Sequence, residues 1–194
     1  VTIPVLKLKE VPLKFEFSNV PAGYDPAELN ASISPATIRI AGAADTVDGI
    51  ESVNAGFINL ARVQLGKAET LKIQLSEGLV NVDDVQEATV TFDTSGYGEP
   101  RAITVSDIRV VNAPSGVDVK VITESINNVT LVGEAEELAA ISPSDVIAQV
   151  DASAQNITVK GSGQQQFSAQ IIVTGTKTVF ATGAYSVLCD ITVK

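Results

Sequence analysis

Residues 32–60, SISPATIRIAGAADTVDGIESVNAGFINL, set the plan of the whole chain, because residues 124–152, ESINNVTLVGEAEELAAISPSDVIAQVDA, repeat it. In each copy, a short stretch alternates apolar and polar side chains and ends on a glycine, Gly42 or Gly133. Such alternation predicts a strand with one buried face. A second stretch of extended type closes each copy. The sequence therefore predicts a duplicated, β-rich module.

Each glycine is followed by a short helical pattern. Val47 and Ile50 in the first copy, and Leu138 and Ile141 in the second, are apolar residues three positions apart. This spacing predicts a short helix with one side lying on a sheet. Acidic residues gather at the beginning of both patterns, where a helix N-terminus favours negative charge. They are Asp45 in the first copy and Glu134, Glu136 and Glu137 in the second.

The rest of the chain also shows β patterns. Apolar and polar residues alternate over residues 6–17, and a second extended pattern covers residues 103–111. Long helical periodicity is absent, so we expect an all-β chain with mainly antiparallel strands and one short helical turn per domain. Residues 94–100 form a short run that contains Gly and Pro, and this run marks the expected boundary between the two domains. The prediction is thus two tandem copies of one module, with domains at residues 1–95 and 99–194.

Composition limits the function. The 194 residues include 45% hydrophobic residues, enough for a packed core, and 13 basic against 23 acidic residues give a net charge of −10. This balance argues against nucleic acid as a partner, because binding it requires Lys and Arg to neutralise phosphates. Histidine is absent, which removes the commonest general base and the commonest zinc ligand. Methionine is also absent, so we expect a removed or further segment before Val1. No apolar run of 18 residues is present in the sequence.

Three groups of residues are candidates for chemical sites. Cys189 alternates with Val187 and Ile191 in an apolar stretch, so we expect it to be a small core residue. A calcium-like cation site and a phosphate loop were the other two possibilities. Neither has the spacing that such sites require, so a solvated acidic turn and an ordinary loop are the preferred interpretations. The residues concerned are Glu77, Asp83, Asp84 and Glu87 for the cation, and residues 175–178, GTKT, for the phosphate.

Tyr24, Tyr97 and Tyr185 are too dispersed in the sequence to suggest a stacking platform for sugars or bases. We therefore predict no catalytic, cofactor-binding or metal-binding residues.

Several stretches carry a family resemblance. They are VPL at 11–13 leading to NVPAGY at 19–24, SPATIRIAG at 34–42, DVIAQVD at 145–151, and the strand, loop and strand between Leu71 and Phe92. With them the chain resembles the YbbR-like domain family, in tandem, over nearly its whole length. The resemblance implies a bacterial parent protein with an N-terminal transmembrane helix and several such domains outside the cytoplasm. It implies no catalytic residue, ligand or cofactor.

The best-studied members of that family regulate the membrane diadenylate cyclase that makes cyclic di-AMP. We therefore expect a non-enzymatic, extracytoplasmic module of a membrane-tethered protein, with a membrane protein, such as that cyclase, as its partner. Strand edges and the loops around Gly42 and Gly133 are the expected contact surface. The alternative is a module that binds a cell-wall or other extracellular ligand in a pocket between the domains. An enzyme that uses a carboxylate pair, as in glycoside hydrolysis, is a third hypothesis.

Overall fold

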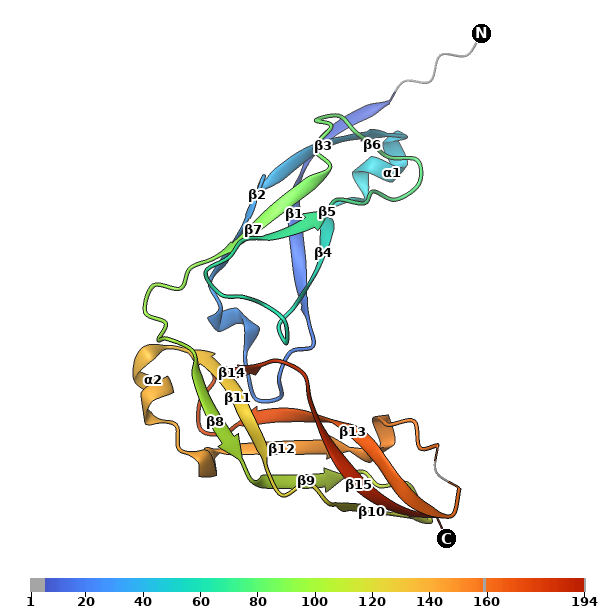
Figure 1. Ribbon diagram of the computed structural model, residues 1–194. Helices are drawn as coiled ribbons and strands as arrows, with labels where there is room; N and C mark the ends of the chain where they lie inside the picture. Colours follow the sequence, from blue (N-terminus) through green and yellow to red (C-terminus); the bar gives the residue numbers. More distant parts are fainter. Residues whose placement is uncertain (1–5, 159, 194) are drawn as a thin grey trace. The chain divides into compact units, whose positions relative to one another are not determined.

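The computed structural model describes residues 6–158 and 160–193, and the chain divides into two compact units (Figure 1). Unit 1 consists of the chain through Ser18, Leu29–Asn59 and Val63–Thr94. Unit 2 consists of Asn19–Glu28, Leu60–Arg62 and the chain from Ser95. This division differs from the predicted domains, 1–95 and 99–194, because residues 19–28 and 60–62 belong to unit 2 and because unit 2 begins at Ser95.

Unit 1 contains two sheets. The first has the strand order β4 (Val53–Asn59), β1 (Lys7–Ser18), β3 (Thr37–Gly42), β6 (Val80–Asn81). The second has the order β2 (Ala31–Ser34), β7 (Glu87–Phe92), β5 (Glu69–Lys72). Helix α1 (Ala44–Asp48) follows β3. The core consists of inward residues of both sheets: Val11, Leu13, Ile38, Ile40, Val53, Ala55 and Ala88.

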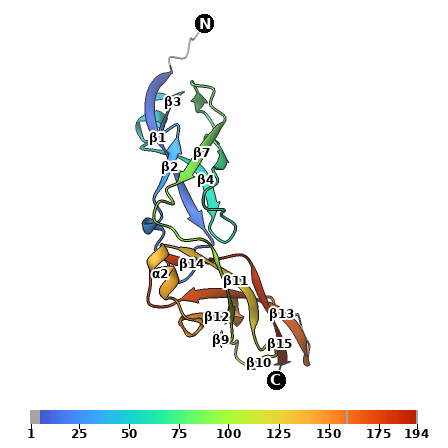
Figure 2. The ribbon, with the colours of Figure 1, turned by 60° about the vertical axis from the view of Figure 1, so that its left-hand side comes forward.

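Unit 2 contains a larger pair of sheets. A five-stranded sheet has the order β10 (Val117–Val121), β15 (Tyr185–Val193), β13 (Ser162–Val173), β12 (Val146–Asp151), β9 (Asp107–Val111). A three-stranded sheet has the order β14 (Val179–Thr182), β11 (Ile126–Gly133), β8 (Arg101–Val105). Helix α2 (Ala135–Ala140) follows β11 and lies next to it in both views (Figures 1 and 2). Three 3₁₀ turns complete the unit: η1 (Pro26–Glu28), η2 (Pro143–Asp145) and η3 (Ala152–Ala154).

The two units repeat one topology. β1 pairs antiparallel with β3 and parallel with β4, and its counterparts β8 and β9 pair in the same way with β11 and β12. β6 and β14 add antiparallel to β3 and β11. Lys9 lies opposite Ile40, and Arg101 lies opposite Leu131. Ile40 and Leu131 each lie two residues before the glycine that ends their strand, so Lys9 and Arg101 occupy equivalent positions in the two units. The predicted fold class is confirmed: strands dominate, most pairs are antiparallel, and each copy has one short α-helix.

Helices α1 and α2 lie where the sequence predicted them. Val47 is fully buried and Leu138 is almost so, and each belongs to the side of its helix that faces a sheet. Ile50 and Ile141, three residues later, also contact the core clusters. Within the described part of the chain, no helix has the length and apolar composition needed to cross a bilayer.

Gly133 and Gly42 end their strands where another backbone approaches closely. A Cβ atom on Gly133 would lie 2.4 Å from the carbonyl oxygen of Thr178 and 2.7 Å from the Cα of Val179. A Cβ atom on Gly42 would lie 3.0 Å from the carbonyl oxygen of Gly78. Only glycine therefore fits beside β14 at the first of these positions without a shift of the backbone.

Candidate functional site

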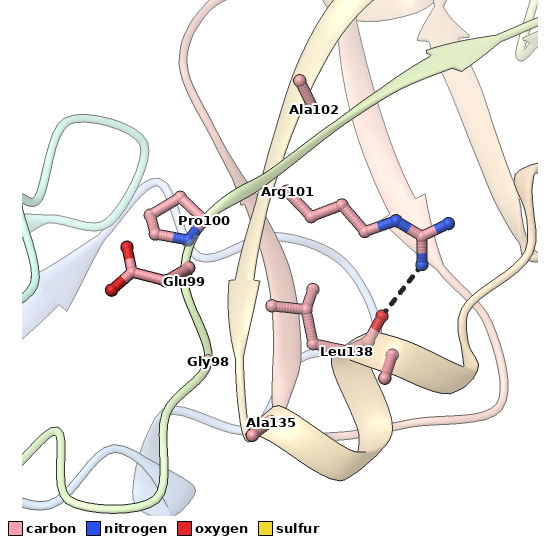
Figure 3. Close-up of a pocket in the computed structure, with 8 residues that line it drawn as sticks. Gly98, Glu99, Pro100, Arg101, Ala102, Ala135 and Leu138 are labelled. Carbon is pink, nitrogen blue, oxygen red and sulfur yellow. Dashed lines mark hydrogen bonds between the residues drawn. The ribbon is translucent and has the colours of Figure 1, made fainter.

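A hollow of about 510 Å³ opens on the surface of unit 2, between the chain that leads into β8 and helix α2 (Figure 3). The strand side contributes Gly98, Glu99, Pro100, Arg101 and Ala102, and the helix contributes Ala135, Leu138 and Ala139. The lining is mainly apolar, with two charged side chains. It contains a single carboxylate, that of Glu99, whereas glycoside hydrolysis requires two. Its apolar lining is suited to contact with an apolar group.

The backbone on both sides of the hollow is held in place. The amide of Gly98 donates to the carbonyl of Gly133 at 3.0 Å, and the amide of Ala135 donates to the carbonyl of Gly96 at 2.9 Å. A Cβ atom on Gly98 would lie 3.2 Å from both the Cα of Ala135 and the Cδ2 of Leu138. The absence of a side chain at Gly98 thus lets the strand approach the helix closely.

Arg101 ties β8 to the end of α2. Its Nη1 donates to the carbonyl oxygens of Leu138 at 3.1 Å and Ile141 at 2.8 Å, and Figure 3 shows the first of these bonds. Carbonyl groups at a helix C-terminus lack partners within the helix, and a cation there also complements the helix dipole. Among the described residues, no carboxylate forms an ion pair with Arg101. Its charge therefore remains available to a polar group at the rim of the hollow.

Unit 1 carries different side chains at the positions equivalent to the rim of the hollow. Lys9, the equivalent of Arg101, donates its Nζ to the carbonyls of Val47 and Ile50, the equivalents of Leu138 and Ile141. Beside it, Lys7 forms an ion pair with Asp48. The corresponding residues of unit 2 are Glu99 and Ala139, which cannot form such a pair. An ion pair thus joins strand and helix in unit 1, whereas Glu99 and Ala139 line the hollow in unit 2.

The residues weighed as a phosphate loop have an internal role. The hydroxyls of Thr176 and Thr178 both donate to Oε2 of Glu137 in α2, the second at 2.7 Å. These hydrogen bonds lower the pKa of Glu137. The hydroxyl groups that would bind a phosphate thus bind the Glu137 carboxylate. These hydrogen bonds hold the loop after β13 against α2. This agrees with the preferred interpretation of the loop.

The residues weighed as a cation site are not brought together. Asp83 accepts hydrogen bonds at 2.6 Å from the backbone amide and the Nε of Arg39. Asp84 accepts one from the side-chain amide of Gln86 at 3.0 Å. Within residues 6–158 and 160–193, no group of three or more His, Cys, Asp or Glu side chains could hold a metal ion. Asp83 instead forms an ion pair with Arg39 on the outer face of β3.

Cys189 is fully buried in the core of unit 2, as expected, and burial raises the pKa of its thiol. The tyrosines are far apart in the sequence, yet two of them meet in the fold. Tyr24 and Tyr97, which are remote in the sequence, are neighbours in unit 2, and the ring of Tyr24 packs on Phe180 with centroids 4.4 Å apart. Tyr185 lies apart from them, and its hydroxyl donates to the carbonyl of Thr182 at 2.6 Å.

The hydroxyls of Tyr24 and Tyr97 are both buried without a well-formed hydrogen bond. Burial raises the pKa of Tyr24, and the adjacent Tyr97 raises it further. The two phenol groups are close enough for each to affect the pKa of the other. Their geometry, however, is not that of a hydrogen bond. The NVPAGY turn that ends at Tyr24 was the only sequence signal for this cluster.

One comparison with known proteins supports the resemblance found in the sequence, for part of the chain. The family model described as YbbR-like protein matches residues 11–94, so the resemblance is confirmed for that stretch. No curated protein matches the chain. A solution structure of a protein from Streptococcus thermophilus is 20% identical, covers 47% of this chain and 89% of its own, and has a TM-score of 0.36. The crystal structure of a YbbR-like protein from Streptococcus pneumoniae TIGR4 is 16% identical, covers 100% of this chain and 98% of its own, and has a TM-score of 0.34.

Proposed function

We propose that this chain, whose residues 11–94 are a YbbR-like domain, is a non-catalytic protein-contact module of a membrane-anchored protein and acts outside the cytoplasm. Its partner is a membrane protein, and the diadenylate cyclase that makes cyclic di-AMP is the partner that the family resemblance suggests. No cofactor takes part, and the module acts on the partner through binding alone.

The hollow beside α2 is the observation that carries the proposal. Its mainly apolar lining can receive one apolar side chain of a partner, and apolar contacts that exclude water on binding concentrate binding energy in protein interfaces. Arg101 and Glu99 at its rim can orient polar groups around that anchor. The net charge of −10 also favours a partner with a basic surface, because opposite charges speed and orient the encounter.

The test fills the hollow with the groups that unit 1 has there. Glu99→Lys combined with Ala139→Asp reproduces the pair formed by Lys7 and Asp48. Glu77→Gln, at an exposed position of unit 1, makes the same change in net charge and leaves the hollow intact. The complete parent protein and both variants are crosslinked in their native membranes, and the captured partners are identified by mass spectrometry.

We expect the cyclase to be captured by the unchanged protein and by Glu77→Gln, and to be lost with the double variant. Cellular cyclic di-AMP should then change with the double variant alone. Equal capture by all three proteins would refute the hollow as the contact. Recovery of cell-wall material without the cyclase would refute the regulatory function in favour of ligand binding.

A further inference from the structure

In unit 2, the outer face of the β11–β14 pair is covered by a loop. Val132 lies opposite Phe180 in register, and both point away from the core that Leu131 and Ala181 line. The two side chains are nevertheless only 6% and 1% exposed. Tyr24 packs on Phe180, at the end of the turn Asn19-Val20-Pro21-Ala22-Gly23-Tyr24. A second segment lies beside the end of β14, because the amide of Gly183 donates to the carbonyl of Ala61 at 2.6 Å.

Unit 1 has the same face without a cover. Ala41 and Val80 lie opposite each other between β3 and β6, in the positions of Val132 and Phe180. Leu8 continues the row on β1, where it lies opposite Ala41. Val80 is 53% exposed and Leu8 is 55% exposed. Val82, two residues along from Val80, is exposed as well. We call Leu8, Ala41, Val80 and Val82 the open row.

The open row is unusual for a sheet face in contact with water. Strand alternation places polar residues on such a face, and large aliphatic side chains gathered there mark contact surfaces in soluble domains. In the other copy, the residue equivalent to Val80 is Phe180, and it is covered by a tyrosine at the end of a turn that contains proline and small residues. Aliphatic side chains at Leu8 and Val80 can receive an aromatic ring in the same way.

The second copy of the turn in this chain cannot provide that cover. Asn112 and Gly116 repeat the positive φ angles of Asn19 and Gly23, at 53° and 78° against 50° and 87°. The position of the tyrosine is, however, occupied by Val117, which begins β10 and lies opposite Val193 of β15. A second copy of this chain therefore offers the open row no aromatic side chain from that turn.

We propose that the open row is the docking surface for the first-strand turn of a further module of this kind joined on its N-terminal side. The turn has the pattern Asn-x-Pro-x-Gly-Tyr, and its tyrosine packs on Val80 as Tyr24 packs on Phe180. The proposal is independent of the contact at the hollow, which lies on unit 2.

The test extends the complete chain by one module. Residues 1–97 are placed before residues 6–194, because Lys9 and Arg101 are equivalent in register and this junction places Lys9 as many residues after residue 97 as Arg101 is in the natural chain. Val80→Cys in the downstream copy provides a thiol for maleimide labelling, since the natural Cys189 is buried. Phe57→Cys, on β4 at a position that is 62% exposed, is the matched control. Leu8→Cys replaces Val80→Cys if that variant fails to fold.

We expect the extension to slow the labelling of Val80→Cys by at least about tenfold, because only the undocked state reacts. Labelling of Phe57→Cys should not change. Tyr24→Ala in the added module should restore the rate at Val80→Cys. Unchanged labelling on extension, or protection that survives Tyr24→Ala, would overturn the proposal. Labelling of the unextended chain that slows as its concentration rises would overturn it too, because the cover would then be a second copy.

Discussion

Gly133→Ala should destabilise unit 2 by about 3 kcal/mol, because the added methyl group meets the backbone of β14. The new Cβ would lie 2.4 Å from the carbonyl oxygen of Thr178, and ordinary contact begins at 3.4 Å, so the two chains must separate by about 1 Å. Overpacking of this kind costs roughly 1–3 kcal/mol. The shift also stretches the short β11–β14 ladder, and each weakened hydrogen bond adds about 1 kcal/mol.

Two other glycines calibrate this value. Gly42→Ala makes the equivalent change in unit 1, where the Cβ would lie 3.0 Å from the nearest backbone oxygen, so we expect a loss of about 1 kcal/mol. Gly175→Ala has open space around the new methyl group but a φ of +81°, and isolates the cost of the left-handed backbone, about 1 kcal/mol.

Urea unfolding followed by far-UV circular dichroism measures all three variants, with the transitions of the two units fitted separately when they resolve. Hydrogen exchange of the β14 amides provides a local measure, because protection there should fall in Gly133→Ala and persist in Gly175→Ala. If Gly133→Ala lost no more stability than Gly175→Ala, the close approach of β14 would not be what requires glycine at this position.

Three further predictions concern single side chains. Tyr24→Phe removes a buried hydroxyl that lacks a partner, so we expect unchanged stability or a gain of up to about 1 kcal/mol in urea unfolding, and a clear loss would reveal a partner for that hydroxyl. Arg39 holds the pKa of Asp83 below its unfolded value near 3.8, so this carboxylate stabilises unit 1 above that pH and ceases to do so as pH falls through its folded pKa. In Asp83→Asn, the free energy of unfolding should therefore fall less steeply as the pH is lowered below 4. The same steepness in the variant and the unchanged protein would contradict this. Cys189, buried and with a raised pKa, should resist thiol reagents in the native protein and react fully in urea.

The sequence was sufficient for the features that depend on local periodicity. Alternation along β3 and β11 indicates which side chains face a core, and the i, i+3 spacing of Val47 and Ile50 indicates a short helix after the strand. Such patterns depend on which side of an element is buried, and each element carries that information in its own residues. The glycines that end the two strands were visible for the same reason, although the close approach of the chain before β6 to Gly42, and of β14 to Gly133, was not.

The tertiary structure alone decided what covers each outer face. Residues 19–28 lie between two strands of unit 1, yet they belong to unit 2, where Tyr24 meets Phe180 and Tyr97. The hollow beside α2 likewise depends on which residues the fold places opposite each other. Where unit 1 has Lys7 and Asp48, unit 2 has Glu99 and Ala139. Each is a change of one residue in the sequence, but its effect depends on the strand and the helix lying next to each other in the fold. Local periodicity determines that a face is buried, whereas residues more than 30 positions away determine what buries it.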